Sequence, residues 1–138
     1  MRQIQHILLL MLMSASLCGC SKLSKEAKEI TGIYYNPEIS HNEPVMELHK
    51  NATCVIRAIK PGVLTYSVEG DWNVLNDSLI INIEPSTLKF EGDSTIIGNI
   101  PKRIVRKIAS HNELSLQLEQ DGVSYIFQRQ KRTNDSGK

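Results

Sequence analysis

Residues 113–130, ELSLQLEQDGVSYIFQRQ, contain the pattern that decides the fold. In the first half, leucines alternate with polar residues, and this spacing places the leucines on one face of a β-strand. Asp121-Gly122 follows, a dipeptide that favours a two-residue hairpin turn. Aromatic residues continue the apolar face beyond the turn. The stretch therefore predicts two antiparallel strands with these inward residues: Leu114, Leu116, Leu118, Tyr125 and Phe127.

Upstream, short β-rich runs separated by turn residues recur at close intervals from Thr31 onward. Links this short join antiparallel neighbours, because a parallel crossover needs a dozen or more residues. We therefore predict an all-β fold, an antiparallel up-and-down meander of eight or nine strands. The predicted strands are Thr31–Asn36, Val45–Lys50, Thr53–Ile59, Leu64–Leu75, Ser78–Glu84, Thr87–Ile97 with an interruption at Gly92-Asp93, Arg103–Ala109, Glu113–Gln120 and Val123–Gln130.

Alternation also identifies the inward faces of the other strands. Gly70, in the middle of the longest run, predicts a bulge or a tight bend where the sheet curls toward closure. Cys54 alternates with Ile56 and Ala58 on an inner face, so we expect a buried and inert thiol. The remaining inward residues are Tyr66, Val68, Trp72, Val74, Leu79, Ile81 and Ile83.

Residues 100–108 fit two interpretations. Ile100 and the apolar residues after it lie at helical spacing, with four cations on the opposite side. However, Ile104, Val105 and Ile108 are β-branched, and a hairpin-like link joins the segment to a clear strand. We favour a strand and keep a short helix as the alternative. We expect the cations on a solvated surface, with a lipid headgroup, an anionic glycan or a partner as the functional alternative; they are Lys102, Arg103, Arg106 and Lys107.

The N-terminal residues have the pattern of a targeting signal. Arg2 supplies a positive charge, and residues 7–17 form an apolar run far shorter than the roughly 20 residues of a spanning helix. Leu17-Cys18-Gly19-Cys20 closes this run and resembles the cleavage box of bacterial lipoproteins. The resemblance implies that residues 1–19 are a signal peptide and that Cys20 carries acyl chains such as palmitate, which form a membrane anchor. The alternative is an ordinary secretory signal cut nearby, with Cys20 a plain thiol.

The lipoprotein resemblance also implies a location and a domain layout. Ser21 stands where an aspartate is often linked to inner-membrane retention, so we expect a lipid-anchored cell-envelope protein of the outer membrane. The leaflet that it faces stays open. Residues 20–30 are predicted to be the lipidated cysteine and a polar tether, residues 31–132 a β-barrel domain, and residues 133–138 a disordered tail. Cys54 is then the only thiol of the folded part, which leaves no internal disulfide.

The strand pattern resembles that of lipocalin-like lipoproteins of Gram-negative envelopes. The likeness lies in Thr31-Gly32-Ile33-Tyr34, in the run from Gly70 to Ile81 and in Tyr125-Ile126-Phe127-Gln128-Arg129. Lipocalins begin with Gly-x-Trp and place an arginine of the last strand across that tryptophan. The resemblance implies a small calycin-type barrel in which Gly32, Tyr34 and Arg129 close the base, with Tyr34 in the tryptophan position.

Charge and aromatic content exclude some classes of partner. The chain has 16 Lys and Arg against 15 Asp and Glu, and removal of Arg2 with the signal leaves 15 of each. This balance offers no electrostatic basis for binding nucleic acid, so we expect no nucleic-acid partner. Aromatic residues make up 5% of the chain, which supplies few stacking platforms for sugars or bases.

Motifs for chemistry are sparse. His41-Asn42-Glu43 and His111-Asn112-Glu113 have a spacing that would bridge a metal on a strand, but both fall at turns, where solvated side chains are the simpler expectation. No Gly-x-Ser-x-Gly motif frames a serine nucleophile. Ser78 and Ser94 each follow an aspartate in a pattern that resembles the acceptor sites of bacterial O-glycosylation. We predict no catalytic residue, no metal and no cofactor, and therefore no enzyme.

Two functions from different classes fit this sequence. The first is a lipid-anchored envelope lipoprotein that binds a small apolar or amphipathic molecule inside its barrel. The second is a structural or interaction lipoprotein, whose barrel is filled by its own side chains and whose surface docks an envelope protein partner. The interior volume separates the two. The candidate ligand-lining residues are Tyr66, Trp72, Leu79, Ile81, Leu116 and Phe127.

Overall fold

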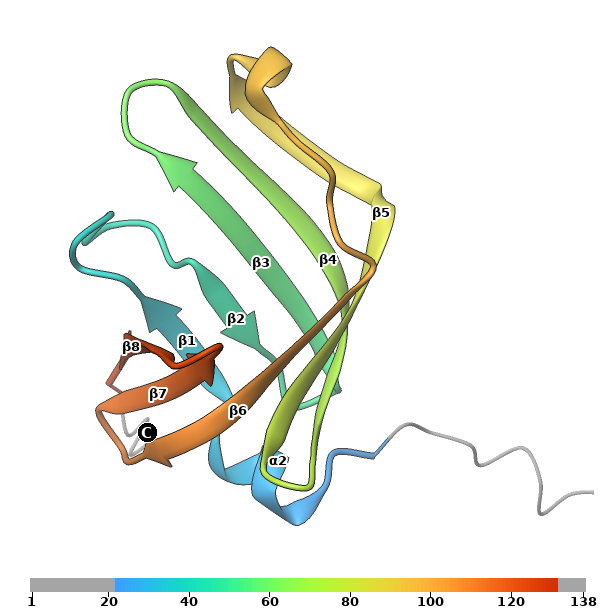
Figure 1. Cartoon of the computed structure of the whole chain (residues 1–138), viewed down its shortest axis with the longest axis vertical. Helices are drawn as coiled ribbons and strands as arrows, with labels where there is room; N and C mark the ends of the chain where they lie inside the picture. The colour runs from blue at the N-terminus through green and yellow to red at the C-terminus, as the bar shows by residue number, and fades with distance from the viewer. Residues whose placement is uncertain (1–21, 132–138) are drawn as a thin grey trace, which may run out of the picture.

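The computed structural model describes residues 22–131. Within this range, eight antiparallel strands form a closed barrel in which each strand pairs with its neighbour in sequence and β1 pairs with β8 (Figure 1). The predicted all-β, up-and-down barrel is therefore confirmed. The strands are β1 (Gly32–Tyr35), β2 (Met46–Leu48), β3 (Thr53–Lys60), β4 (Leu64–Leu75), β5 (Ser78–Gly92), β6 (Arg103–His111), β7 (Ser115–Gln120) and β8 (Val123–Arg129).

Two of the hairpin turns follow directly from their residues. Asn76 and Asp77 link β4 to β5 with φ of 51° and 61°, and Asp121 and Gly122 link β7 to β8 with φ of 51° and 78°. Positive φ at both central residues gives the turn a twist that matches the twist of the paired strands. Asn, Asp and Gly adopt this conformation at low cost, which sets the register of both hairpins.

Strand β5 is one element where the sequence predicted two. Pro85 separates the predicted runs, but β5 continues through it to Gly92. Ser67 pairs with Lys89 and Glu69 pairs with Glu84, so four residues of β5 bulge opposite one residue of β4. In the described chain, β6 pairs with β5 only as far as Asn82. Pro85 lies beyond that point, so its missing backbone N–H breaks no hydrogen bond to β6. The end of the second predicted run is instead a short 3₁₀ helix, η2 (Ser94–Ile96).

Residues 103–111 form strand β6, so the strand interpretation of this segment is confirmed and the alternative of a short helix is wrong. Ile81 of β5 pairs with Ile104, and Leu118 of β7 pairs with Ile108. Both isoleucines pack against the buried core. The pairing on both sides satisfies the backbone of this segment, so local helical spacing is overridden by the sheet.

The predicted tether is wrong for residues 23–30. These residues hold helix α2 (Lys25–Glu29), which lies across one end of the barrel (Figure 1). Leu23, Ala27 and Ile30 are buried on one face of this segment. Ser24 caps the helix by accepting the N–H of Ala27, and its own hydroxyl donates to the Val74 carbonyl oxygen at 2.8 Å. Leu23, Ala27 and Ile30 have the i, i+4, i+7 spacing of one helix face, which was the sequence signal for this element. A helix of this length is only marginally stable in water unless it packs on the barrel.

The half of the barrel next to α2 is filled by side chains. Trp72 is 2% exposed, and its indole N–H donates to the His49 carbonyl oxygen at 2.9 Å. Leu48, Cys54 and Leu116 are fully buried around it. Trp72 thus lies on the predicted inner face, where it fills the core.

Gly70 marks a close approach of backbones. A Cβ at this position would lie 1.8 Å from the Asn82 carbonyl oxygen of β5, a distance that only displacement of the strand could relieve. The bulge itself lies just before Gly70 in the chain, at Ser67–Glu69. The predicted tight bend is therefore a contact that requires the absence of a side chain.

Leu114 departs from the predicted inward face. It is 59% exposed, because β7 begins one residue later, at Ser115. The Asn112 side-chain oxygen accepts the N–H of Leu114 at 2.7 Å and that of Ser115 at 2.9 Å. This local turn competes with the strand and leaves the leucine outside the core. Leu116 and Leu118, by contrast, are buried as predicted.

Candidate ligand-binding site

The base of the barrel is closed by Tyr34 and Arg129, which are register partners on β1 and β8. The Arg129 guanidinium carbon lies 5.9 Å from the centroid of the Tyr34 ring. Arg129 donates to the carbonyl oxygens of Glu29 (3.1 Å), Asn112 (3.3 Å) and Thr31. Tyr34 and Arg129 are therefore in contact, as predicted. Through these contacts Arg129 links the last strand to the first strand and to the segment around α2.

Gly32 belongs to the same closure. A Cβ at Gly32 would lie 2.9 Å from Nε of Arg129, so the guanidinium occupies space that a side chain would take. The Tyr34 hydroxyl donates to the Ile30 carbonyl oxygen at 2.7 Å, which fixes the residue that follows α2. The three predicted closure residues therefore act together at the end of the barrel covered by the helix.

A cavity of about 610 Å³ occupies the other half of the barrel. Its rim includes Ile39 and Tyr125, which are 38% and 45% exposed, so the cavity opens to solvent at the end away from α2. Tyr125 faces inward as predicted but lies at the mouth. Apolar residues of six strands supply the wall: Met46, Ile56, Ile81, Ile104, Leu118 and Phe127.

The predicted ligand-lining residues divide into two groups. Leu79, Ile81 and Phe127 line the cavity. Trp72 and Leu116 are not part of its wall, because they pack in the filled half near the base. Tyr66 is also absent from the wall, since it lies on the part of β4 that pairs with Phe90 beyond the bulge. The sequence predicted that these side chains face the interior. It did not predict their position along the barrel axis, which decides whether they lie in the filled half or at the cavity.

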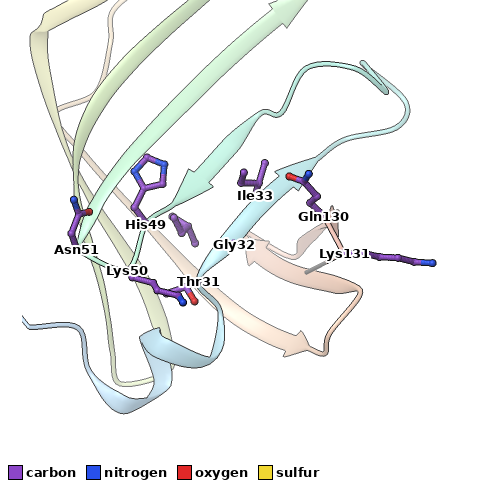
Figure 2. A pocket seen from close by; sticks show the side chains of 9 residues that line it. Thr31, Gly32, Ile33, His49, Lys50, Asn51, Gln130 and Lys131 are labelled. Carbon is purple, nitrogen blue, oxygen red and sulfur yellow. The ribbon is translucent and has the colours of Figure 1, made fainter. Parts of the chain in front are cut away.

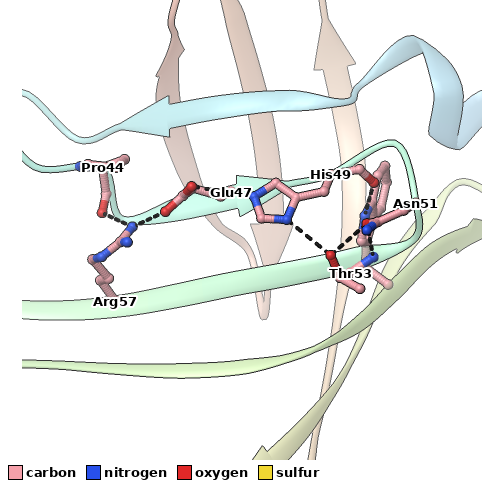
Figure 3. Close-up of polar contacts among 7 residues, drawn as sticks. Pro44, Glu47, His49, Asn51, Thr53 and Arg57 are labelled. Atoms are coloured by element: carbon pink, nitrogen blue, oxygen red, sulfur yellow. Dashed lines mark hydrogen bonds and ion pairs between the residues drawn. The ribbon is translucent and has the colours of Figure 1, made fainter. Parts of the chain in front are cut away.

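Four polar residues border the cavity: Asn36, Arg57, Arg106 and Gln120. The Arg57 guanidinium itself points to the outer face of β3, where Glu47 lies. The Arg57 guanidinium pairs with the carboxylates of Glu43 and Glu47. It also donates to the Pro44 carbonyl oxygen, and Figure 3 shows Pro44 and Glu47 on either side of it. Arg106 is half-buried and inward-facing, which corrects the prediction that all four cations of its strand are solvated. Its alternation with Ile104 and Ile108 was the signal for this orientation.

Glu47 belongs to a polar row on the outer face of β2 and β3. His49 lies 3.4 Å from Glu47 through Nε2 and 3.0 Å from the Thr53 hydroxyl through Nδ1 (Figure 3). Burial opposes ionisation of Glu47, but the hydrogen bonds from Arg57 and His49 outweigh it and hold the pKa below its ordinary value of 4.5. The row stabilises the pairing of the short β2 with β3.

Cys54 is 1% exposed and reduced. Burial raises the pKa of its thiol to about 12, and the charge of Asp71 acts in the same direction. Its Sγ donates to the Asp71 carbonyl oxygen at 3.6 Å. A thiol in these surroundings is a poor nucleophile, so Cys54 serves as a small apolar core residue.

A second hollow, of about 730 Å³, lies outside the barrel near its base. Figure 2 shows Thr31, His49, Lys50 and Gln130 around it, and these residues come from the start of β1, the turn after β2 and the segment after β8. Most of the residues that line it are polar or charged, and it lies on the outside of the barrel rather than between facing strands. It is therefore a less enclosed site than the interior cavity.

The two His-x-Glu pairs do not form a metal site in the described part of the chain. No group of three or more His, Cys, Asp or Glu side chains within residues 22–131 has the geometry to hold a metal ion. His111 lies instead 3.6 Å from Glu29, so it contacts the helix at the base. Among the helices of the same residues, none is long and apolar enough to cross a membrane.

Comparison with known proteins adds a likeness in fold. No protein-family model matches the chain, and no curated protein does. Among solved structures, the chain is similar to a lipocalin-like protein from Bacteroides uniformis, with 17% sequence identity and a TM-score of 0.48. The match covers 73% of this chain and 98% of that chain. No ligand or activity is transferred from it.

Proposed function

We propose that this protein is a non-enzymatic, lipid-anchored lipoprotein of the cell envelope, and that its barrel binds a small apolar or amphipathic molecule. The observation that carries the binding function is the cavity of about 610 Å³ between apolar strand faces, open at one end. Cavities of this size, with mostly apolar walls and a few placed polar groups, are typical of sites for small ligands. The anchor rests on the lipoprotein cleavage box that ends at Cys20, and the outer-membrane location rests on Ser21 in place of an aspartate.

The alternative, a barrel filled by its own side chains that docks an envelope partner, fits only half of the molecule. The half beside α2 is packed around Trp72 and Tyr34. The other half holds the cavity, and the half-buried Ile56 and Ile104 form part of its wall. A hollow of this kind sacrifices packing contacts that a purely structural barrel would make. This difference favours ligand binding.

The direct test is native mass spectrometry of the full-length protein purified from its own envelope. A small molecule that stays bound in gentle conditions and leaves on activation supports the proposal. In addition, a neutral apolar dye such as Nile red should bind the purified protein with a large fluorescence gain.

A matched pair of variants locates that binding. Ala58→Phe places a ring in the cavity from β3, whereas Val55→Phe places the same ring on the outward face of that strand. We expect Ala58→Phe to weaken dye binding at least tenfold and Val55→Phe to leave it unchanged. Equal binding by both variants would place the dye elsewhere and count against the interior site.

A further inference from the structure

Arg106 is a cation on an otherwise apolar inward face. Its neighbours on the same face of β6 are Ile104 and Ile108, and its partner on β5 is Leu79. Ile104, Leu79 and Arg106 all line the interior cavity. The guanidinium therefore lies at the wall of a space that is otherwise suited to hydrocarbon.

The charge of Arg106 has no acidic counterpart among residues 22–131. Within residues 22–131 it lies in no ion pair, and its one hydrogen bond goes to the Val105 carbonyl oxygen at 2.9 Å. Arg57, the other arginine that borders the cavity, has its guanidinium on the outer face, where it pairs with Glu43 and Glu47. In the described chain no Asp or Glu lines the cavity, so the interior has a net positive charge that is centred on Arg106.

An uncompensated charge in an apolar wall is costly unless a ligand supplies its partner. A guanidinium has five N–H donors and prefers carboxylate or phosphate oxygens, which it binds in a bidentate manner. Gln120 also lines the cavity, and it follows directly on the pairing of Lys107 with Glu119, which places it across from Arg106. An amide donor beside the guanidinium completes a small anion-binding group.

We infer that the ligand is an anionic amphiphile, with its hydrocarbon chain against the apolar wall and a carboxylate or phosphate monoester at Arg106. This inference rests on the proposed binding function and specifies its ligand class. Neutral apolar molecules fill the same space but leave the guanidinium unpaired. The charged end supplies selectivity, because a neutral ligand covers the half-buried guanidinium without giving it an acceptor.

The test compares a charged and a neutral form of one fluorescent chain. cis-Parinaric acid and its methyl ester differ only in the carboxylate, so we expect the wild-type protein to bind the acid at least tenfold more tightly. Arg106→Gln should weaken acid binding about tenfold or more, the range expected when one charge-assisted hydrogen-bond pair is lost, and should leave ester binding unchanged. Arg106→Lys, which keeps the charge, should retain most of the preference for the acid.

Arg103→Gln is the matched control. Arg103 is an exposed cation on the outward face of the same strand, so its removal changes the net charge equally without touching the cavity. We expect acid binding by this variant to equal that of the wild type. If Arg103→Gln and Arg106→Gln weaken acid binding equally, the effect is long-range attraction and the inference is overturned.

Displacement of the bound acid separates the two sources of the anion. Oleate tests a carboxylate and 1-oleoyl lysophosphatidic acid tests a phosphate monoester; displacement by either supports the inference, and the tighter competitor names the headgroup. If neutral monoolein competes as well as both, Arg106 selects nothing and the inference fails while the proposed function stands. If neither the acid nor the ester binds the wild-type protein, the proposed function itself fails.

Discussion

Arg129→Ala is the sharpest test of how this barrel is closed. The side chain is 6% exposed, donates hydrogen bonds to three backbone carbonyl groups and lies over the Tyr34 ring. Hydrogen bonds from a charged donor each contribute about 1.5–3 kcal/mol, but the desolvation of a buried charge offsets part of their sum. We therefore expect removal of this buried, hydrogen-bonded side chain to lower the free energy of unfolding by about 3–5 kcal/mol.

A loss of 3 kcal/mol lowers the melting temperature of a domain of this size by roughly 12–24 °C. Trp72, the single tryptophan, is buried in the same half of the barrel, so its fluorescence in urea reports the relevant unfolding. Lys131→Ala is the control, because this exposed residue lies just beyond β8 and its truncation should change stability by less than about 0.5 kcal/mol. Midpoints that are equal for the two variants would refute the proposed role of Arg129 in closure.

Four further predictions concern other parts of the chain. Metabolic labelling with a palmitate analogue should tag the protein, and Cys20→Ala should abolish the tag; labelling that persists would contradict the anchor. Gly70→Ala should destabilise the barrel by several kcal/mol, because its Cβ meets the β5 backbone, whereas Gly98→Ala, which has open space around it, should be close to neutral in the same urea titration. The lowered pKa of Glu47 means that its ion pair stabilises the fold above pH 4.5 and is lost as the pH falls through the folded-state pKa, so the stability difference between wild type and Glu47→Gln should vanish in acid. Cys54, whose pKa is raised to about 12, should react with Ellman's reagent at pH 8 only after unfolding, and rapid labelling of the native protein would show that the base is open.

Most of the barrel was predictable because its strands are half-buried. Alternation in β5 and β7 assigned Leu79, Ile81, Leu116 and Leu118 to the interior, and all four are buried. Turn dipeptides such as Asp121-Gly122 specified the order of the hairpins. The pairing of Tyr34 with Arg129 came from a family resemblance, since nothing in local spacing indicates that the first and last strands meet.

The predictions that failed concern tertiary effects. Helix α2 is only five residues long, and its stability comes from burial of Ala27 and Ile30 against the barrel, which local propensity does not contain. Arg106 was grouped with the other cations of its strand by composition, although its position in the alternation placed it inside. The continuity of β5 through Pro85 depends on where β6 stops pairing, which is a property of the whole sheet.

If Cys20 carries the proposed lipid anchor, the docking of α2 on the barrel base sets the direction in which the cavity opens relative to a bilayer. Leu23 is buried and Ser24 is bonded to Val74, so the chain between the proposed anchor at Cys20 and the barrel spans at most about 10 Å. With acyl chains at Cys20, the closed end would rest near the headgroups and the mouth at Tyr125 would point into the aqueous compartment. A ligand would then enter from the aqueous side, after it leaves a membrane or is delivered by a soluble carrier. The anchored barrel would bind its ligand at a fixed place on the membrane and would not carry it between membranes.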